Sequence, residues 1–217
     1  MSRTMSYEQI RAEVLAGFDQ DDWSSYHQLV GWLREIGAAD GALKVGEPAP
    51  DFLLPDADGN LVSSARLREK GPLVLSFFQG GWCPFCTAEL RALQEAESKF
   101  GAAGASLVVI SPDTQHFPRQ LRKENGLDLT ILGDVDYGVA MAYGVLFAVP
   151  EGVLRHYARR GVDIGGRHGS PVTMLPIPAT FVVDRHGGIA SAFVEPDFTR
   201  RQEPDEILKM LEEAARR

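Results

Sequence analysis

The feature that most constrains this chain is an apolar run followed at once by a cysteine pair and a helical pattern. Residues 72–78 (PLVLSFF) have the length and hydrophobicity of a central strand that is buried on both faces. Residues 87–100 are mostly good helix formers, with Leu90 and Leu93 near helical spacing. The glycine-containing residues 79–82 interrupt the pattern. The sequence therefore predicts a strand, a tight loop and a helix in succession.

Both cysteines of the chain, Cys83 and Cys86, open this predicted helix. Pro84 between them is tolerated in a first helical turn, and positions i and i+3 share one face of a helix. The unpaired N–H groups and the positive dipole end of a helix lower the pKa of a thiol from its usual value of about 8.5. The spacing therefore predicts a redox-active pair, and small buried core cysteines are the plain alternative.

Two other uses of a cysteine pair fit less well. A structural disulfide would be unusual in a cytosolic chain, and a bridge across so short a loop would constrain the unfolded chain very little. A tetrahedral zinc site needs four ligands, whereas the five histidines are scattered without ligand spacing. We therefore expect neither a metal nor a bound organic cofactor.

Composition limits the partners. The 217 residues amount to about one and a half typical domains. With 30 acidic and 22 basic side chains the net charge is -8, and such a protein repels nucleic acid and anionic lipid. The apolar runs are shorter than the ~20 residues that cross a bilayer, and the first residues lack the apolar core of a signal peptide. We expect a cytoplasmic protein that binds neither nucleic acid nor membrane.

From about residue 45 to residue 214 the order of motifs resembles the thioredoxin superfamily, and more narrowly its peroxiredoxin-like (AhpC/TSA, or redoxin) branch. Residues 45–52 (VGEPAPDF) resemble the opening strand of that family, and residues 77–90 resemble its active-site loop and helix. Residues 107–113 (LVVISPD) resemble a strand plus loop, and residues 177–187 a strand entering a hairpin. The resemblance implies an α/β thioredoxin-like fold, a mixed sheet flanked by helices.

The resemblance to peroxiredoxins is incomplete at the site. Their pattern P-x-x-x-T-x-x-C ends on the cysteine that attacks peroxide, and the Thr and a distant Arg polarise the peroxide oxygens. Aligned on Cys86, this chain has Gln79 in place of the Pro, Cys83 in place of the Thr and Pro178 near the place of the Arg. A substitute donor is needed, and we expect it from backbone N–H groups or from residues 147–177.

The same residues resemble thioredoxin instead. Trp82 and the two cysteines resemble the W-C-x-x-C motif, and Ile177-Pro178 resembles the loop whose cis-proline packs against it. This half of the resemblance implies a cis bond before Pro178 and substrate binding by Trp82, Pro178 and Thr180. The thioredoxin resemblance also implies that Cys83 is the attacking thiol, whereas the peroxiredoxin alignment implies that Cys86 attacks. The position of Cys83 at the very end of the helix modestly favours Cys83.

Three functions follow from these motifs. A thiol peroxidase would reduce hydroperoxides through the Cys83/Cys86 pair and be recycled by an external dithiol, from a thioredoxin-like or glutathione-type reductant. A thiol-disulfide oxidoreductase would exchange the same pair with protein disulfides. A non-catalytic redox sensor or binding module is the third. The family's association with peroxide defence favours the first.

The flanking segments complete the prediction. Residues 1–44 are expected to be a helical extension, with helices over 7–18 and 23–36, the second capped by Asp22, and residues 45–217 the thioredoxin-like domain. The extension would pack on the core or contribute to a homodimer contact.

Further along, residues 150–160 read as a short helix and residues 161–170 as a glycine-rich loop, which either roof the site or form a surface excursion. Residues 203–217 read as a terminal helix. Isolated His156 and His168 are expected to be structural, with proton donation in such a roof as the alternative. The carboxylates Glu89 and Asp113 are also expected to be structural, with tuning of the thiols as the alternative.

Overall fold

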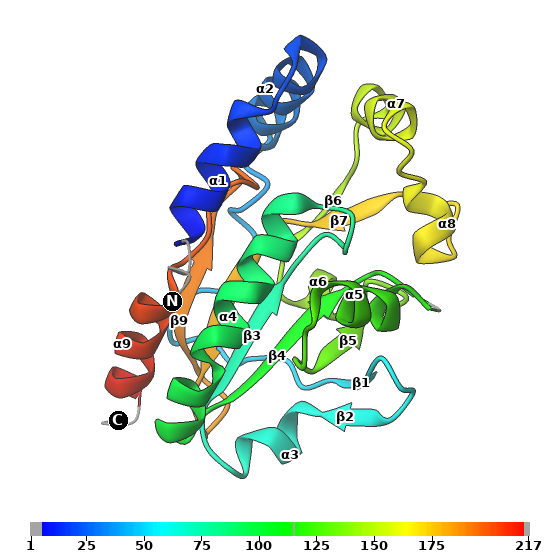
Figure 1. Ribbon diagram of the computed structural model, residues 1–217. Helices are drawn as coiled ribbons and strands as arrows, with labels where there is room; N and C mark the ends of the chain where they lie inside the picture. Colours follow the sequence, from blue (N-terminus) through cyan, green and yellow to red (C-terminus); the bar gives the residue numbers. More distant parts are fainter. Residues whose placement is uncertain (1–5, 115, 215–217) are drawn as a thin grey trace.

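The computed structural model describes residues 6–114 and 116–214, and a five-stranded mixed sheet lies at its centre (Figure 1). In spatial order the strands are β5 (Ile131–Gly133), β4 (Ser106–Ser111), β3 (Leu73–Phe77), β8 (Ala179–Val183) and β9 (Ile189–Val194). β3, β4 and β5 run parallel, whereas β8 pairs antiparallel with both β3 and β9. The predicted mixed sheet is therefore present.

The central strand β3 is the apolar run that the sequence predicts. All five of its residues are buried, as expected for a strand covered on both faces. Phe77, its last residue, is in register with Ile110 of β4 and Ala179 of β8. The chain therefore leaves the middle of the sheet at the point where the cysteine-containing loop begins.

Helices cover the sheet. The long helix α4 (Pro84–Ala102) packs against β4, and the terminal helix α9 (Pro204–Ala214) packs beside α4 and against β8 and β9. The shorter helices α3 (Ser64–Arg68), α5 (Phe117–Asn125) and α6 (Gly138–Ala142) follow β2, β4 and β5 along the chain. The predicted terminal helix is confirmed as far as residue 214, and residues 215–217 lie outside the described residues.

The amino-terminal segment forms the two predicted helices, α1 (Tyr7–Ala16) and α2 (Gln20–Glu35). α2 begins earlier than predicted because Asp19, and not Asp22, is its N-cap and accepts hydrogen bonds from the N–H groups of Asp21 and Asp22. Asp22 completes a capping box by accepting from the Asp19 N–H. α1 packs against α4 and α2 against α7. A domain boundary at residue 44 stays a prediction.

The predicted opening strand over residues 45–52 is wrong. The first strand is β1 (Leu53–Pro55), which pairs with β2 (Leu61–Ser63), and the preceding residues contribute an isolated bridge from Pro48 to Gly188. Gly46 and Ala49 donate to the carbonyls of Ile189 and Gly187, both at 2.8 Å, beside the start of β9. Pro48 and Pro50 lack N–H donors, so this pairing does not extend into a strand.

The segment from residue 146 to residue 176 is a hairpin that carries two helices. β6 (Leu146–Ala148) and β7 (Met174–Pro176) pair antiparallel, and α7 (Glu151–Arg159) and α8 (Ile164–His168) lie between them. α7 confirms the predicted short helix, but the predicted loop over residues 161–170 is wrong because it contains α8. Asp163 caps that helix by accepting from the Gly166 N–H at 3.0 Å.

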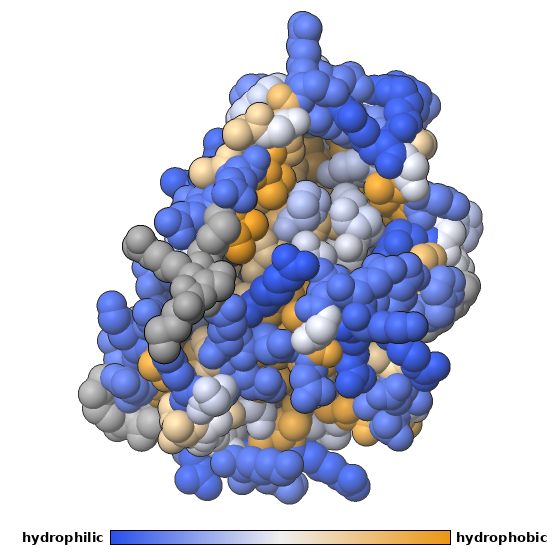
Figure 2. Space-filling view, viewed as in Figure 1, coloured by the Kyte–Doolittle hydropathy of each residue, from blue (hydrophilic) through white to orange (hydrophobic). Residues whose placement is uncertain are grey.

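These pieces meet at one end of the molecule. Figure 1 shows α2 and α7 at the end of the sheet toward which the amino end of α4 points. Figure 2 shows a hollow there, where apolar atoms lie between the amino-terminal helices and α7 beneath a hydrophilic rim. None of the helices within residues 6–114 and 116–214 is long and apolar enough to cross a membrane.

Candidate active site

The loop between β3 and α4 is held by an aspartate that follows the neighbouring strand β4. Asp113, two residues beyond β4, is buried and accepts a hydrogen bond from the Gly81 N–H at 2.9 Å. Arg167 of α8 binds the same carboxylate through Nε and Nη2, each at 2.9 Å. Gly80 has a φ of +146°, and a Cβ there would lie 2.5 Å from Trp82 Nε1. Only glycine fits this turn, which leads the chain directly into α4.

Cys83 and Cys86 lie together at the amino end of α4, as predicted. Cys83 is the N-cap, Pro84 opens the first turn, and the Cys86 N–H donates to Cys83 Sγ at 3.4 Å. Both are free thiols, and their exposed fractions are only 2% and 0%. The two sulfurs are therefore shielded from bulk solvent and close enough to act as one unit.

A buried arginine stands beside the inner cysteine. Arg201, from the segment between β9 and α9, places Nη2 at 3.4 Å from Cys86 Sγ. Its Nε donates to the carboxylate of Glu89, which is one turn along α4 from Cys86 and also accepts from Ser76 Oγ at 3.2 Å. Arg201 and Glu89 are 7% and 3% exposed. The carbonyls of Phe198 and Arg200 accept the remaining hydrogen bonds from Arg201.

The surroundings shift the pKa values of the two thiols in opposite directions. Burial alone would raise the pKa of Cys86, but the hydrogen bond from the Cys83 thiol and the charge of Arg201 outweigh it, so this pKa is lowered. The nearby backbone of Gln79 also lowers the pKa of Cys86. Burial and then the contact with Cys86 raise the pKa of Cys83. Of the two, Cys86 is therefore the thiol that loses its proton more readily.

Arg201 stays charged in this environment. Burial alone would lower the pKa of its guanidinium, but the neighbouring Glu89 and Cys86 raise it. Burial raises the pKa of Glu89, and Arg201 opposes this shift. A buried cation is stable only with such partners, so the Glu89 carboxylate holds Arg201 in place beside the sulfur.

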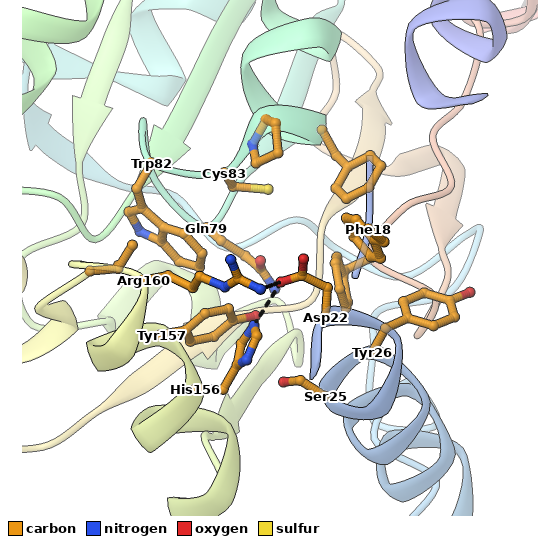
Figure 3. Close-up of a pocket in the computed structure, with 14 residues that line it drawn as sticks. Phe18, Asp22, Ser25, Tyr26, Gln79, Trp82, Cys83, His156, Tyr157 and Arg160 are labelled. Carbon is orange, nitrogen blue, oxygen red and sulfur yellow. Dashed lines mark ion pairs between the residues drawn. The ribbon is translucent and has the colours of Figure 1, made fainter. Parts of the chain in front are cut away.

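A cavity of about 170 Å³ opens in front of Cys83. Its lining comes from four places in the chain: the α1–α2 region, the loop and start of α4, α7 with the residues after it, and Phe198 (Figure 3). The lining residues are Phe18, Asp22, Ser25, Tyr26, Gln79, Trp82, Cys83, Pro84, Phe85, His156, Tyr157, Arg160, Val162 and Phe198. Cys83 thus faces the cavity, and Cys86 lies behind it.

Ion pairs between α2 and the α7 region hold the two sides of the cavity together. Asp22 Oδ1 lies 3.0 Å from Arg160 Nη2 and 3.4 Å from His156 Nε2. Asp21 Oδ2 lies 2.8 Å from Arg159 Nη2. The helical segment after β6 therefore does roof the site, which was one of the two alternatives predicted for it.

The structure separates the predicted substrate-binding residues. Trp82 lines the cavity and packs edge-on against Tyr157, with ring centroids 4.9 Å apart. Pro178 and Thr180 do not line it, and Thr180 is buried in β8 opposite Ser76 of β3. Their part in binding substrate stays a prediction.

The predicted cis bond before Pro178 is wrong. Every peptide bond within the described residues is trans, and Ile177 continues directly from β7 toward β8 with its N–H bonded to the Val145 carbonyl at 2.6 Å. This extended passage needs no tight turn, so the ordinary trans preference holds. The thioredoxin half of the resemblance loses this support.

Sequence reasoning missed Arg201. The expected substitute donor from residues 147–177 is not the one beside Cys86, because the guanidinium comes from 115 residues farther along the chain. The local signal is only the pair Arg200-Arg201 before a helix, a pattern that ordinarily indicates a solvated surface. The unusual feature, its burial against Glu89, exists only in the folded chain.

A buried thiol pair at the amino end of the helix that follows the central strand of a mixed sheet defines a thiol-based redox protein of the thioredoxin type. Residues 45–192 match the model of the AhpC/TSA family. A protein named as a candidate peroxiredoxin in Mycobacterium tuberculosis is 34% identical over 150 residues, which cover 69% of this chain and 84% of that protein. The chain therefore belongs to the AhpC/TSA family.

Two further comparisons agree with this assignment. The chloroplastic peroxiredoxin Q of Oryza sativa subsp. japonica is 27% identical over 172 residues, which cover 79% of this chain and 68% of that protein. The crystal structure of the peroxidoxin BcpB from Mycobacterium tuberculosis superposes with a TM-score of 0.62 at 23% identity, covering 79% of this chain and 97% of that one. The predicted thioredoxin-like fold is confirmed, and the protein is a thiol-based, peroxiredoxin-like peroxidase.

Proposed function

We propose that Cys86 is the sulfur that attacks hydroperoxide and that Cys83 resolves the product. The observation that carries this assignment is the contact between Arg201 Nη2 and Cys86 Sγ at 3.4 Å, together with the lowered pKa of Cys86. The thiolate is the nucleophilic form of cysteine. The argument that favoured Cys83, its place at the helix end, is outweighed by its raised pKa.

The reaction balances with the two cysteines and an external dithiol. The Cys86 thiolate attacks the outer peroxide oxygen, so that an S–O bond forms and the O–O bond breaks, and the leaving oxygen takes a proton and departs as an alcohol or water. Cys86 is then a sulfenic acid. Cys83 attacks this sulfur, a disulfide forms and water leaves. The external dithiol reduces the disulfide by thiol exchange.

The charges around Cys86 support each step. Arg201 stabilises the thiolate before attack and the charge that develops on oxygen as the O–O bond breaks. The Cys83 thiol occupies the position that a threonine has in the peroxiredoxin pattern and hydrogen-bonds the Cys86 sulfur. When the reductant attacks Cys83, which faces the cavity, Cys86 leaves as a stabilised thiolate, and a leaving thiol of low pKa departs faster.

The first test compares substrates. We expect steady-state turnover of hydrogen peroxide and of an organic hydroperoxide with a thioredoxin-like or glutathione-type reductant, and little reduction of insulin disulfides by the same sample. Insulin reduction without peroxide turnover would favour the second candidate, a thiol-disulfide oxidoreductase. That candidate draws its support from the position of Cys83 at the cavity. A recycled dithiol pair works under reducing conditions, so we propose a cytoplasmic location.

We expect Cys83 and Cys86 to form a reversible intramolecular disulfide. Their place within one helical turn allows the two sulfurs to meet. After mild oxidation, mass spectrometry with thiol alkylation should show both thiols protected in a monomeric chain and released by dithiothreitol. Free thiols under these conditions would contradict the two-cysteine cycle and leave a pair of buried core cysteines.

A further inference from the structure

The side chain of Gln79 is a buried polar group with nothing to pair with. The residue is 1% exposed and lines the cavity next to Cys83. Within the described part of the chain, neither its Oε1 nor its Nε2 has a hydrogen-bond partner. Buried side-chain amides are nearly always paired, because an unpaired donor and acceptor are costly away from water. This amide therefore requires an explanation.

Gln79 lies beside the redox-active cysteines. Its backbone lies close enough to Cys86 to lower the pKa of that thiol, while its side chain lines the cavity beside Cys83. Figure 3 shows the Gln79 side chain below Cys83, between the α7 side chains and those of the amino-terminal helices. A ligand that enters the cavity beside Cys83 therefore lies next to this amide.

The charged groups of the cavity wall are already paired. Asp22, His156 and Arg160 pair with one another across the cavity, and the hydroxyl of Tyr26 donates to Asp197 at 3.0 Å. These contacts neutralise the charges at the rim. Within the described residues, the buried wall atoms without a partner are Oε1 and Nε2 of Gln79 and Nε1 of Trp82. The indole can only donate, so Gln79 supplies both a donor and the acceptor for a neutral ligand.

The rest of the lining is aromatic. Phe85 lies edge-on between Phe18 and Phe198, with ring centroids at 6.0 Å and 5.9 Å, and Tyr26 packs on Phe198 at 5.7 Å. Trp82 and Tyr157 form the opposite side. Phe18, Tyr26 and Phe198 lie outside residues 45–192, the span of the family match. Much of this apolar wall therefore comes from segments outside the family match.

We propose that Gln79 binds the peroxide group of an organic hydroperoxide whose apolar part occupies the aromatic cavity. The O–O–H group offers one donor and adjacent acceptors, which match Oε1 and Nε2 of a primary amide. This proposal rests on the proposed peroxidase function and adds the residue that orients the substrate. Gln79 neither gains nor loses a proton. Its Nε2–H group holds the leaving oxygen while the O–O bond breaks, the role that the absent threonine and arginine of the family pattern would have.

Gln79→Leu removes the hydrogen bonds and keeps an apolar side chain of similar size. We expect kcat/KM for cumene hydroperoxide and for hydrogen peroxide to fall about tenfold to a hundredfold, mainly through kcat. The pKa of Cys86, followed by thiolate ultraviolet absorbance, should stay unchanged because the backbone at residue 79 remains. The melting temperature should hold or rise, since an unpaired buried amide is removed. Gln79→Asn, which keeps a shorter amide, should retain more activity than Gln79→Leu.

Two more variants complete the test. Phe18→Ala should lower kcat/KM for cumene hydroperoxide several-fold more than kcat/KM for hydrogen peroxide, because only the organic substrate fills the aromatic wall. Gln120→Leu, on the exposed face of α5, is the matched control and should behave as the wild type. An unchanged kcat/KM in Gln79→Leu would overturn the inference while peroxidase activity in the wild type still stands. Absence of peroxide turnover in the wild type would instead overturn the proposed function.

Discussion

Arg201→Met is expected to lower kcat/KM for hydrogen peroxide by roughly a hundredfold to a thousandfold, as the loss of a charge-stabilising donor does. The guanidinium is the cation in contact with the Cys86 sulfur. Arg200→Met removes a neighbouring exposed guanidinium and should change little. Steady-state kinetics of the two variants measure the difference.

Arg201→Met should also shift the pH dependence of kcat/KM. Because the pKa of Cys86 is lowered in the wild type, its thiolate is present above that pKa and activity falls as the pH drops through it. Without Arg201 this pKa rises, so the acid limb of the kcat/KM profile should move to higher pH. An unmoved acid limb with nearly normal kcat/KM would show that Arg201 does not activate the thiol.

Measurements of the free energy of unfolding distinguish the chemical role of Arg201 from its structural role. Removing the guanidinium leaves Glu89 buried without its cation, which costs about 3–5 kcal/mol. The double variant Arg201→Met with Glu89→Gln removes the isolated charge and should recover much of the free energy of unfolding. It should not recover activity. Recovery of both would mean that the single variant fails only because it unfolds.

Cys86→Ser should abolish peroxide turnover, a loss of roughly a thousandfold or more as for other catalytic nucleophiles. Cys83→Ser should still consume peroxide in a single turnover, because the thiolate of Cys86 remains, and should lose dithiol-driven cycling. The hydroxyl of a serine at position 83 can still hydrogen-bond Cys86, so this variant is the matched control for the pair. Equal single-turnover consumption by both variants would contradict separate roles.

The sequence predicted the parts of the site that depend on local pattern. The β3 strand, the loop and the cysteine-capped α4 follow from an apolar run, two glycines and the rules for helix ends. The helices α1, α2 and α7 also follow from periodicity. Errors occurred where local chemistry was misread: Asp19 caps α2 in place of Asp22, and Asp163 caps a helix inside a glycine-rich stretch.

What the sequence could not predict is contact between distant segments. Arg201 reaches Cys86 across 115 residues, and Arg160 reaches Asp19 of the α2 cap across 141. Neither arginine stands in a motif, and burial, which makes Arg201 unusual, is a property of the folded chain. The cis-proline prediction failed because it transferred a thioredoxin feature to residues that here form an extended passage from β7 to β8.

Trapping of the sulfenic acid tests the central claim most directly. Cys83→Ser and Cys86→Ser are each treated with one equivalent of hydrogen peroxide and dimedone, and labelled protein is identified by mass spectrometry. The account predicts dimedone on Cys86 in Cys83→Ser and no label in Cys86→Ser. Label on Cys83 in Cys86→Ser, with none in Cys83→Ser, would contradict it and make Cys83 the attacking sulfur.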